Sequence, residues 1–407
     1  MPEFLKLLSC DEARRILAGF APVGGEDVPT ARGLGRVLAE DFRAPHDLPR
    51  EPRSTVDGYA VRAKDTFGAS DGVPCYLKLI GAVPMGGVFA GAIGAGEAVA
   101  ISTGGVVPEG ADGVVMIEYV DAARDGEIEI HRGVSPLENV IRRGDDLTSG
   151  DVVVARGRRL RPADIGALAG FGQTRVRVFR APRVAVLSTG NEVVAPDIEP
   201  APGQVRDVNQ YALAAQGERA GAEATLAGIV RDDAPALRAR VAELLEVHDV
   251  VMLSGGSSVG ARDVAAEVVG SLGPRGVLLH GINIRPGRPT LVADIGGKPV
   301  LGMPGFPVSA MVIFDVFVRP LLRRIGGEAG REEWPARRRA RFARRYASAV
   351  GREDWVRVRL AGEWASPILG GSAAISTVLR ADGYVRVEAG VEGIDEGAEV
   401  DVLLMTE

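Results

Sequence analysis

The sequence predicts a multidomain α/β protein, with a parallel-sheet α/β domain joined to a discontinuous helical domain and two small β domains. Three observations support this fold class. Between residues 181 and 327, runs of Val, Ile and Leu alternate with amphipathic segments, as in a parallel sheet covered by helices on both faces. Residues 49–139 carry short strand-like segments and no helix-length period. The 54 glycines and 25 prolines among 407 residues exclude a helical bundle, because such residues serve strands and tight turns.

The helical domain is expected to combine two separate stretches, residues 1–48 and 140–180. Apolar residues at three-to-four spacing predict helices at 10–20 and 31–42, and a third helix at 161–168. If these stretches pair, the β region between them is an insertion in a discontinuous domain.

The inserted β domain is expected at residues 49–139 and the second small β domain at 328–407. The strand patterns in the two regions lie at 76–80, 98–102, 113–118, 127–131, 355–360 and 383–388.

The α/β domain is expected at residues 181–327. Its predicted strands lie at 183–188, 224–230, 249–254 and 300–303, and its predicted helices at 209–220, 235–246, 261–272 and 307–325. Ligands of such sheets bind outside the carboxyl ends of the strands, so the loops there are the place to look for chemistry.

Composition limits the class of partner. The net charge of −6 argues against non-specific nucleic-acid binding, and no apolar run is long enough for a membrane span. Cys10 and Cys75 are too few for a disulfide framework or a four-ligand zinc site. The first residues lack a signal-peptide pattern, so we expect a cytoplasmic protein.

Loops rich in glycine and serine follow three of the predicted strands. Gly190 and Glu192 follow the first strand, residues 254–260 the third, and residues 304–309 the last. Such a loop presents free backbone N–H groups at a helix N-terminus and can hold a phosphate or oxyanion. One loop alone could be an ordinary turn, but three on one sheet edge predict a ligand site.

Charged residues near these loops complete the candidate site. Arg285 and Arg288 stand on a proline-rich segment, and paired guanidinium groups suit a tetrahedral dianion, although surface arginines without a role are the alternative. Mg²⁺ takes carboxylates and phosphate oxygens together, so carboxylates beside a phosphate loop suggest a metal–phosphate site. The acidic candidates are Asp57, Glu192, Asp232, Asp233 and Asp263.

Seven motifs carry a resemblance to a known family. They are residues 54–62 (STVDGYAVR), 102–118 (STGGVVPEGADGVVMIE), 143–150 (RGDDLTSG), 188–193 (STGNEV), 254–260 (SGGSSVG), 284–289 (IRPGRP) and 302–310 (GMPGFPVSA). In this order they resemble the molybdopterin molybdenumtransferase family, whose eukaryotic counterparts include the gephyrin E domain. The resemblance covers residues from about 10 to 310, and the C-terminal 80 residues match only weakly.

The resemblance implies four domains, with the α/β domain binding molybdopterin and the C-terminal domain β-barrel-like. It implies an elongated homodimer with its active site at the subunit interface. The implied reaction is the Mg²⁺-dependent insertion of molybdate into adenylylated molybdopterin, with release of AMP. The implied partners are a molybdopterin adenylyltransferase and molybdoenzyme maturation proteins, with no nucleic acid and no membrane.

The resemblance also assigns residues by position. As catalytic residues it implies Asp57, Thr103, Glu192 and Asp263, and as metal ligands Glu192, Asp232 and Asp263. For the molybdopterin it implies Gly190, Ser254, Gly255, Gly256, Ser257, Ser258, Pro304 and Pro307. For molybdate it implies Arg285, Arg288, Ser309, Arg352, Arg357 and Ser376.

The chain departs from the family pattern at four positions. Arg285 and Arg288 replace two lysines, Asn191 replaces an aspartate and Phe306 an asparagine. Two alternatives therefore stay open: a paralogue specialised for tungstate, and a non-catalytic molybdopterin carrier or scaffold. A generic nucleotide-binding protein is disfavoured, because neither GxGxxG nor GxxxxGK[ST] occurs at a strand–helix turn.

Overall fold

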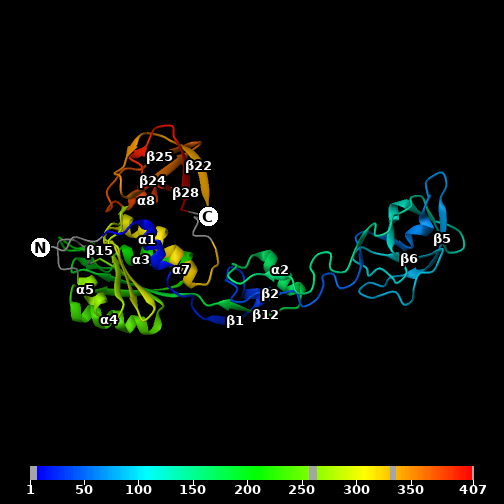
Figure 1. The fold of residues 1–407 in the computed structure, drawn as a ribbon, viewed down its shortest axis with the longest axis horizontal. Coiled ribbons are helices and arrows are strands. Elements are labelled where there is room, and N and C mark those ends of the chain that lie inside the picture. Colours follow the sequence, from blue (N-terminus) through cyan, green and yellow to red (C-terminus); the bar gives the residue numbers. More distant parts are fainter. Residues whose placement is uncertain (1–6, 256–263, 331–335, 406–407) are drawn as a thin grey trace. The chain divides into compact units, whose positions relative to one another are not determined.

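A computed structural model of the chain describes residues 7–255, 264–330 and 336–405. The chain forms two compact units: residues 1–40, 156–161 and 175–407 make the first, and residues 41–155 and 162–174 the second (Figure 1). The described helices include none long and apolar enough to cross a membrane. The domain boundaries expected from the sequence stay a prediction.

A six-stranded sheet forms the centre of the α/β part of the first unit. Its strands run in the order β16 (Glu223–Val230), β13 (Arg183–Thr189), β17 (Val250–Ser254), β21 (Lys298–Met303), β20 (Leu291–Ile295) and β18 (Gly276–His280). The first four are parallel, as the sequence predicts. The sequence analysis missed β20, which pairs antiparallel with β21 through a tight turn at Gly296 and Gly297.

Successive side chains of the central strands point to opposite faces of the sheet, and helices cover both faces (Figure 1). Val184 and Val186 of β13 join a core with α3 (Asn209–Arg219) and α6 (Pro307–Ile313). The intervening Ala185 and Leu187 join a second core. Its helices are α4 (Ala234–Val247) and α5 (Val264–Gly270). All four predicted strands and the predicted helices of this region are confirmed, within the residues that the structure describes.

The helix predicted at 307–325 is continuous but not uniform. α6 passes into a π-helical turn (Phe314–Val318) and then into α7 (Arg319–Ile325). The π turn buries Asp315, whose carboxylate accepts a hydrogen bond from Tyr384 Oη at 3.2 Å. Burial raises the pKa of Asp315, and the nearby Arg319 and Arg219 oppose that shift.

One predicted helix is confirmed near the N-terminus and one is wrong. α1 (Cys10–Leu17) begins with a capping box between Ser9 and Glu12. The segment 31–42 forms only a 3₁₀ turn (Thr30–Arg32), followed by a further turn and isolated bridges at Val37 and Leu38. Gly35 has φ +74°, which interrupts a helix, and the backbone instead pairs across the fold: Leu38 N donates to Arg158 O, and Phe179 N to Val37 O. In the same region β1 (Gly25–Pro29) pairs with β12 (Arg175–Phe179).

The second unit contains the inserted β sheet. Its order is β7 (Gly113–Met116), β4 (Gly58–Val61), β6 (Glu97–Ile101), β5 (Cys75–Ala82), β9 (Glu127–Ile130) and β8 (Val120–Ala122). The four predicted strands are confirmed, whereas β4 and β8 were missed. Outside the sheet, β2 (Phe42–Arg43) pairs with β11 (Val152–Val154) and β3 (Arg53–Ser54) with β10 (Val140–Ile141). The predicted helix at 161–168 is confirmed as α2 (Pro162–Gly170).

The C-terminal part of the first unit is a closed five-stranded barrel. Around it run β24 (Glu353–Ala361), β25 (Trp364–Pro367), β22 (Arg337–Phe342), β28 (Glu399–Leu404) and β26 (Gly383–Val387), and β26 pairs back with β24. Phe342, Val356, Val385 and Val402 fill its core. The short β19 (Ile284–Arg285) pairs with β24 and so connects the barrel to the arginine segment. Both predicted strands of this region are confirmed.

Candidate functional site

Three central strands end together at one edge of the sheet. Ser188 of β13 lies beside Ser254 of β17, which in turn lies beside Met303 of β21. A cleft of about 1160 Å³ opens at this edge. It is lined by nine of the residues singled out in the sequence: Glu192, Ser254, Gly255, Arg285, Arg288, Pro304, Pro307, Ser309 and Arg352. The described parts of the strand-end loops therefore meet at one cleft, and residues 256–260 of the second loop lie outside the described residues.

Gly255, which lines the cleft, is required by the close approach of a backbone atom, and Gly190, next to Thr189 of the lining, is favoured by its backbone conformation. Gly255 has φ +103°, and a Cβ there would lie 2.2 Å from Thr189 O. Gly190 has φ +142°, and a Cβ there would lie 2.7 Å from Glu192 Oε2. The exposed carboxylate of Glu192 thus folds back over Gly190 at the margin of the cleft, and it makes no ion pair with the described part of the chain.

Asn209 at the start of α3 fastens two of the loops together. Its Nδ2 donates to Ser254 Oγ at 2.7 Å and to Gly305 O at 2.8 Å. Sequence reasoning missed this residue, because an asparagine beginning a helix reads as an ordinary cap. Close by, the buried hydroxyls of Ser188 and Thr189 find no hydrogen-bond partner within residues 7–255, 264–330 and 336–405.

The arginine segment is fixed by its backbone. Gly287 has φ +111°, and a Cβ there would lie 2.3 Å from Ile313 Cγ1 of α6. Ile282 N donates to Arg288 O at 2.9 Å, and Thr290 Oγ1 donates to Gly287 O at 2.7 Å. On this frame both guanidinium groups are exposed toward the cleft. Arg288 makes no ion pair with the described residues, which leaves its charge available to a ligand.

The barrel contributes a third guanidinium through Arg352. Its Nε donates to Asp354 Oδ1 at 2.8 Å, and Arg285 Nη1 lies 3.9 Å from Asp354 Oδ2. Tyr346 Oη also donates to Asp354 Oδ2, at 3.2 Å. Burial first, and then the Asp354 charge, raises the pKa of Tyr346, so the phenol stays protonated. The sequence analysis singled out neither Asp354 nor Tyr346.

α6 supplies the remaining wall. Pro307 occupies its first turn, and Ser309 is buried against the cleft. Val308 N donates to Ser372 O at 3.1 Å, which ties this helix to the barrel loop that borders the cleft. Phe306, where the family pattern has an asparagine, is exposed at the same margin.

Besides Gly190, three predicted residues of the first unit do not line this cleft. Asp232 is exposed, and its backbone N–H donates to Asn191 Oδ1 at 3.4 Å. Arg357 lies buried in β24 with Nη2 donating to Gly370 O at 3.1 Å, and burial lowers its pKa. Ser376 is exposed in α8 (Ser376–Leu379). Their assigned roles stay predictions.

Asp57 and Thr103 belong to the second unit. The Thr103 backbone N–H donates to Asp57 Oδ1 at 2.7 Å and its hydroxyl donates to the same oxygen at 3.0 Å. These two hydrogen bonds, the backbone one first, lower the pKa of Asp57 and keep the exposed carboxylate ionised. The next residue, Gly58, begins β4, and a Cβ there would lie 1.9 Å from Val115 O, so this position requires glycine.

Four predicted residues, Gly256, Ser257, Ser258 and Asp263, lie outside the described residues. Within the described residues, no three His, Cys, Asp or Glu side chains gather as a metal-binding group. The predicted set Glu192, Asp232 and Asp263 includes one of the residues outside that description, so it stays a prediction.

The fold and the cleft together define a multidomain α/β protein with an arginine-lined cleft at the carboxyl edge of its sheet. Three family models match the chain: the MoeA N-terminal region (domains I and II) at residues 8–172, a probable molybdopterin-binding domain at 185–324, and the MoeA C-terminal region (domain IV) at 339–405.

Individual relatives agree with these matches. A putative molybdopterin biosynthesis protein of Methanocaldococcus jannaschii is 35% identical over 93% of this chain and 92% of its own length. A molybdopterin molybdenumtransferase of Staphylococcus aureus is 32% identical over 93% of this chain and 90% of its own. The crystal structure of a molybdopterin biosynthesis MoeA protein from Pyrococcus horikoshii is 41% identical, with a TM-score of 0.85 over 99% of this chain and 100% of that one. The chain belongs to the MoeA family of molybdopterin molybdenumtransferases, a family of molybdenum cofactor biosynthesis.

Proposed function

We propose that this protein inserts molybdate into adenylylated molybdopterin, in a Mg²⁺-dependent reaction that releases AMP. One observation carries the proposal: the strand-end loops of the α/β sheet share a single cleft with the guanidiniums of Arg285, Arg288 and Arg352. A phosphate-bearing ligand and an oxyanion could thus be held side by side.

The size of the cleft suits a large substrate. Pockets for drug-sized ligands measure about 300–1,000 Å³. At about 1160 Å³, this cleft has room for a pterin joined to a nucleotide. Apolar Val193, Val205 and Ile284 share its lining with polar groups, which suits a ligand with flat rings and a charged linker.

The oxyanion is proposed to bind at the guanidinium groups. Arginine binds tetrahedral oxyanions through paired N–H donors, and its charge persists at any physiological pH. Arg285 and Arg288 come from one rigid segment and Arg352 from the barrel, so they approach a bound dianion from different elements. Ser309 in the same lining supplies a hydroxyl. Arg357 and Ser376 are kept as further candidates on the resemblance alone.

The phosphate and the metal are proposed to bind at the loops after β13 and β17. Ser254 and Gly255 begin the pterin-phosphate loop, with Pro304 and Pro307 opposite. Mg²⁺ needs only one or two protein carboxylates when phosphates and water fill its other positions. The exposed, unpaired carboxylate of Glu192 fits such a partial donor set, with Asp232 and Asp263 as the other proposed ligands. Bound Mg²⁺ would neutralise negative charge on the phosphate.

The remaining roles rest on the resemblance. Asp57 is proposed as a catalytic carboxylate that Thr103 keeps ionised through its two hydrogen bonds. We propose a cytoplasmic homodimer with the active site at the subunit interface, supplied by a molybdopterin adenylyltransferase and delivering to molybdoenzyme maturation partners.

A direct assay tests the proposal. Purified protein and Mg²⁺ are incubated with adenylylated molybdopterin, adding molybdate, tungstate or no oxyanion, and AMP release and bound metal are followed together. We expect AMP release that depends on the oxyanion, and its loss in Arg285→Ala and in Glu192→Ala. Greater activity with tungstate would identify the tungstate paralogue. Tight binding of the pterin without AMP release in any condition would identify a carrier and contradict the proposed reaction.

A further inference from the structure

Two neighbouring carboxylates of β24, Glu353 and Asp354, are both buried, with 5% and 1% of their surfaces exposed. Successive side chains of a strand point to opposite faces, so the two serve different surroundings. A carboxylate at such depth needs compensating donors, and each residue has its own set.

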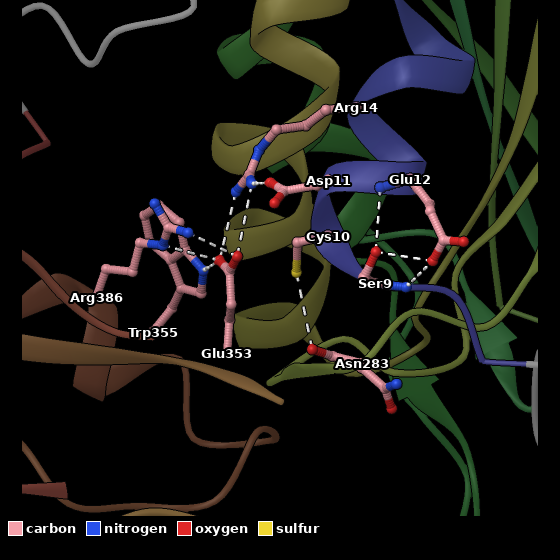
Figure 2. Close-up of polar contacts among 9 residues, drawn as sticks. All are labelled: Ser9, Cys10, Asp11, Glu12, Arg14, Asn283, Glu353, Trp355 and Arg386. Atoms are coloured by element: carbon pink, nitrogen blue, oxygen red, sulfur yellow. Dashed lines mark hydrogen bonds and ion pairs between the residues drawn. The ribbon is translucent and has the colours of Figure 1, made fainter. Parts of the chain in front are cut away.

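Glu353 belongs to a structural clamp (Figure 2). Its carboxylate accepts from Arg386 Nη2 at 2.8 Å and from Trp355 Nε1 at 3.2 Å, both within the barrel. Arg14 of α1 reaches it from the other side, with Nη2 at 3.3 Å. The Glu353 side chain therefore fastens α1 to the barrel and does not reach the guanidiniums that line the cleft.

The backbone of Glu353, and not its side chain, helps to fix the chain that leads into the arginine segment. Asn283 O accepts from Glu353 N at 3.0 Å, and Asn283 N donates to Leu8 O at 2.8 Å. Cys10 Sγ lies 3.7 Å from the same Asn283 oxygen (Figure 2). The backbone of β19 is thus held on both sides before the chain reaches Arg285, and what remains to be set is the direction of the arginine side chain.

Asp354 lies where its carboxylate can set the direction of the Arg285 side chain. It is the register partner of Arg285, and its carboxylate lies within 4 Å of both Arg285 and Arg352, at the distances given above. Tyr346 donates to Oδ2 and fixes the carboxylate in turn. One buried carboxylate therefore contacts two of the guanidiniums that line the cleft, and these two come from different elements.

We propose that Asp354 is a positioning residue of the oxyanion site, setting the spacing of Arg285 and Arg352 so that the site selects a large tetrahedral dianion over a smaller one. The proposal rests on the proposed function for the identity of that dianion.

The test separates positioning from charge. Asp354→Asn removes a negative charge and so strengthens the binding of any dianion. The affinity for one dianion alone therefore cannot distinguish a positioning role from a charge effect. The ratio of the sulfate to the molybdate dissociation constant cancels this common effect. We expect isothermal titration of the full chain to show that this ratio falls at least about fivefold in Asp354→Asn, since small misplacements of binding groups carry large penalties.

The neighbouring residue supplies the matched control. Glu353→Gln removes an equally buried carboxylate one position away, and we expect its selectivity ratio to stay within about twofold of the wild-type value, because the clamp does not touch the oxyanion. An unchanged ratio in Asp354→Asn, or an equal fall in both variants, would overturn the proposal. If Asp354→Asn does not fold, Tyr346→Phe takes its place, with a smaller fall expected and an unchanged ratio counting against the proposal.

A crystallographic measurement keeps this inference separate from the proposed function. In ligand-free Asp354→Asn we expect the Arg285 and Arg352 guanidiniums to leave their present positions, and unchanged positions would overturn the proposal. If the wild-type protein binds no molybdate, the proposed function fails, while this measurement still decides whether Asp354 positions the two arginines.

Discussion

Asn209 Nδ2 donates to Ser254 Oγ and to Gly305 O, so a single amide joins the ends of two strands at the floor of the cleft. The nitrogen and oxygen of the Asn209 side-chain amide cannot exchange places, because the oxygen would then face the Gly305 carbonyl oxygen. Asn209→Ala removes both hydrogen bonds from a buried site, and we expect a loss of about 2 kcal/mol in the free energy of unfolding. Urea unfolding measures this, and molybdate affinity should fall with it. Tyr211→Phe, at an exposed position of the same helix, is the control and should change neither quantity.

The Glu353 clamp should matter more for stability than any surface ion pair. Removing its charge in Glu353→Gln leaves Arg14 and Arg386 beside a neutral amide, and breaking a buried pair in this way costs about 3 kcal/mol. Because both arginines are partly exposed and can rehydrate, we expect about 2 kcal/mol by urea unfolding. Asp11→Asn removes the exposed partner of the same Arg14 and should cost less than about 0.5 kcal/mol. Equal losses in the two variants would contradict the clamp.

The sequence predicted the α/β part well because its signals are local. The Val-rich runs at β13 and β17 are long and apolar, and the helices between them are amphipathic, so pattern alone places them. Residues 31–42 show the limit of the method. Leu34, Val37 and Leu38 have helical spacing, yet Leu34 is 61% exposed and the backbone pairs with distant segments that no local pattern reveals.

The site was predictable where residues of one loop act together and not where distant residues meet. Arg285 and Arg288 stand out because they share one short segment. Asp354 and Asn209 were missed, because each gains its role from partners far along the chain: Arg285 for the first, Ser254 and Gly305 for the second. No spacing along the chain encodes those contacts.

The Gly287 position tests whether the arginine segment must be rigid. In Gly287→Ala, the new Cβ at φ +111° would meet Ile313 of α6, so either the segment or the helix must move. We expect molybdate affinity to fall at least about tenfold, since the guanidiniums are carried by this backbone. Gly296→Ala is the matched control, because it also has a positive φ, +63°, but its Cβ would meet no atom within 4 Å. If both variants lose affinity equally, the loss reflects backbone strain in general and not the packing of Gly287.

Asp57 provides a pH test in the second unit. Thr103 lowers the pKa of this carboxyl below its ordinary 3.8, so the resulting stabilisation is complete above pH 3.8 and is lost as the pH falls through the lower folded value. Thr103→Val removes the hydroxyl donor and keeps the backbone donor, which is the larger cause. We therefore expect the pKa of Asp57 to rise only part of the way toward 3.8, measured by NMR titration of its carboxyl carbon. A fall in this pKa, or no change, would contradict the role of the hydroxyl.

Cys10 gives the last prediction, because burial first and the Glu353 charge second raise the pKa of its thiol from 9.0 to about 12. At pH 8 an ordinary thiol is about one-tenth thiolate, whereas this one is about 10⁻⁴ thiolate, and the thiolate is the reactive form. Burial also raises the pKa of the Cys75 thiol, but Cys75 is only half-buried. Iodoacetamide should therefore modify Cys75 well before Cys10 in the native protein, and both at similar rates in urea, as followed by mass spectrometry. The raised pKa also predicts how the free energy of unfolding depends on pH. Because the folded state favours the neutral thiol, the contribution of Cys10 is complete below pH 9 and is lost as the pH rises toward 12. Urea midpoints should accordingly fall more steeply between pH 8.5 and about 10.5 in the wild-type protein than in Cys10→Ala, and equal slopes would show that the thiol is not protected by its surroundings.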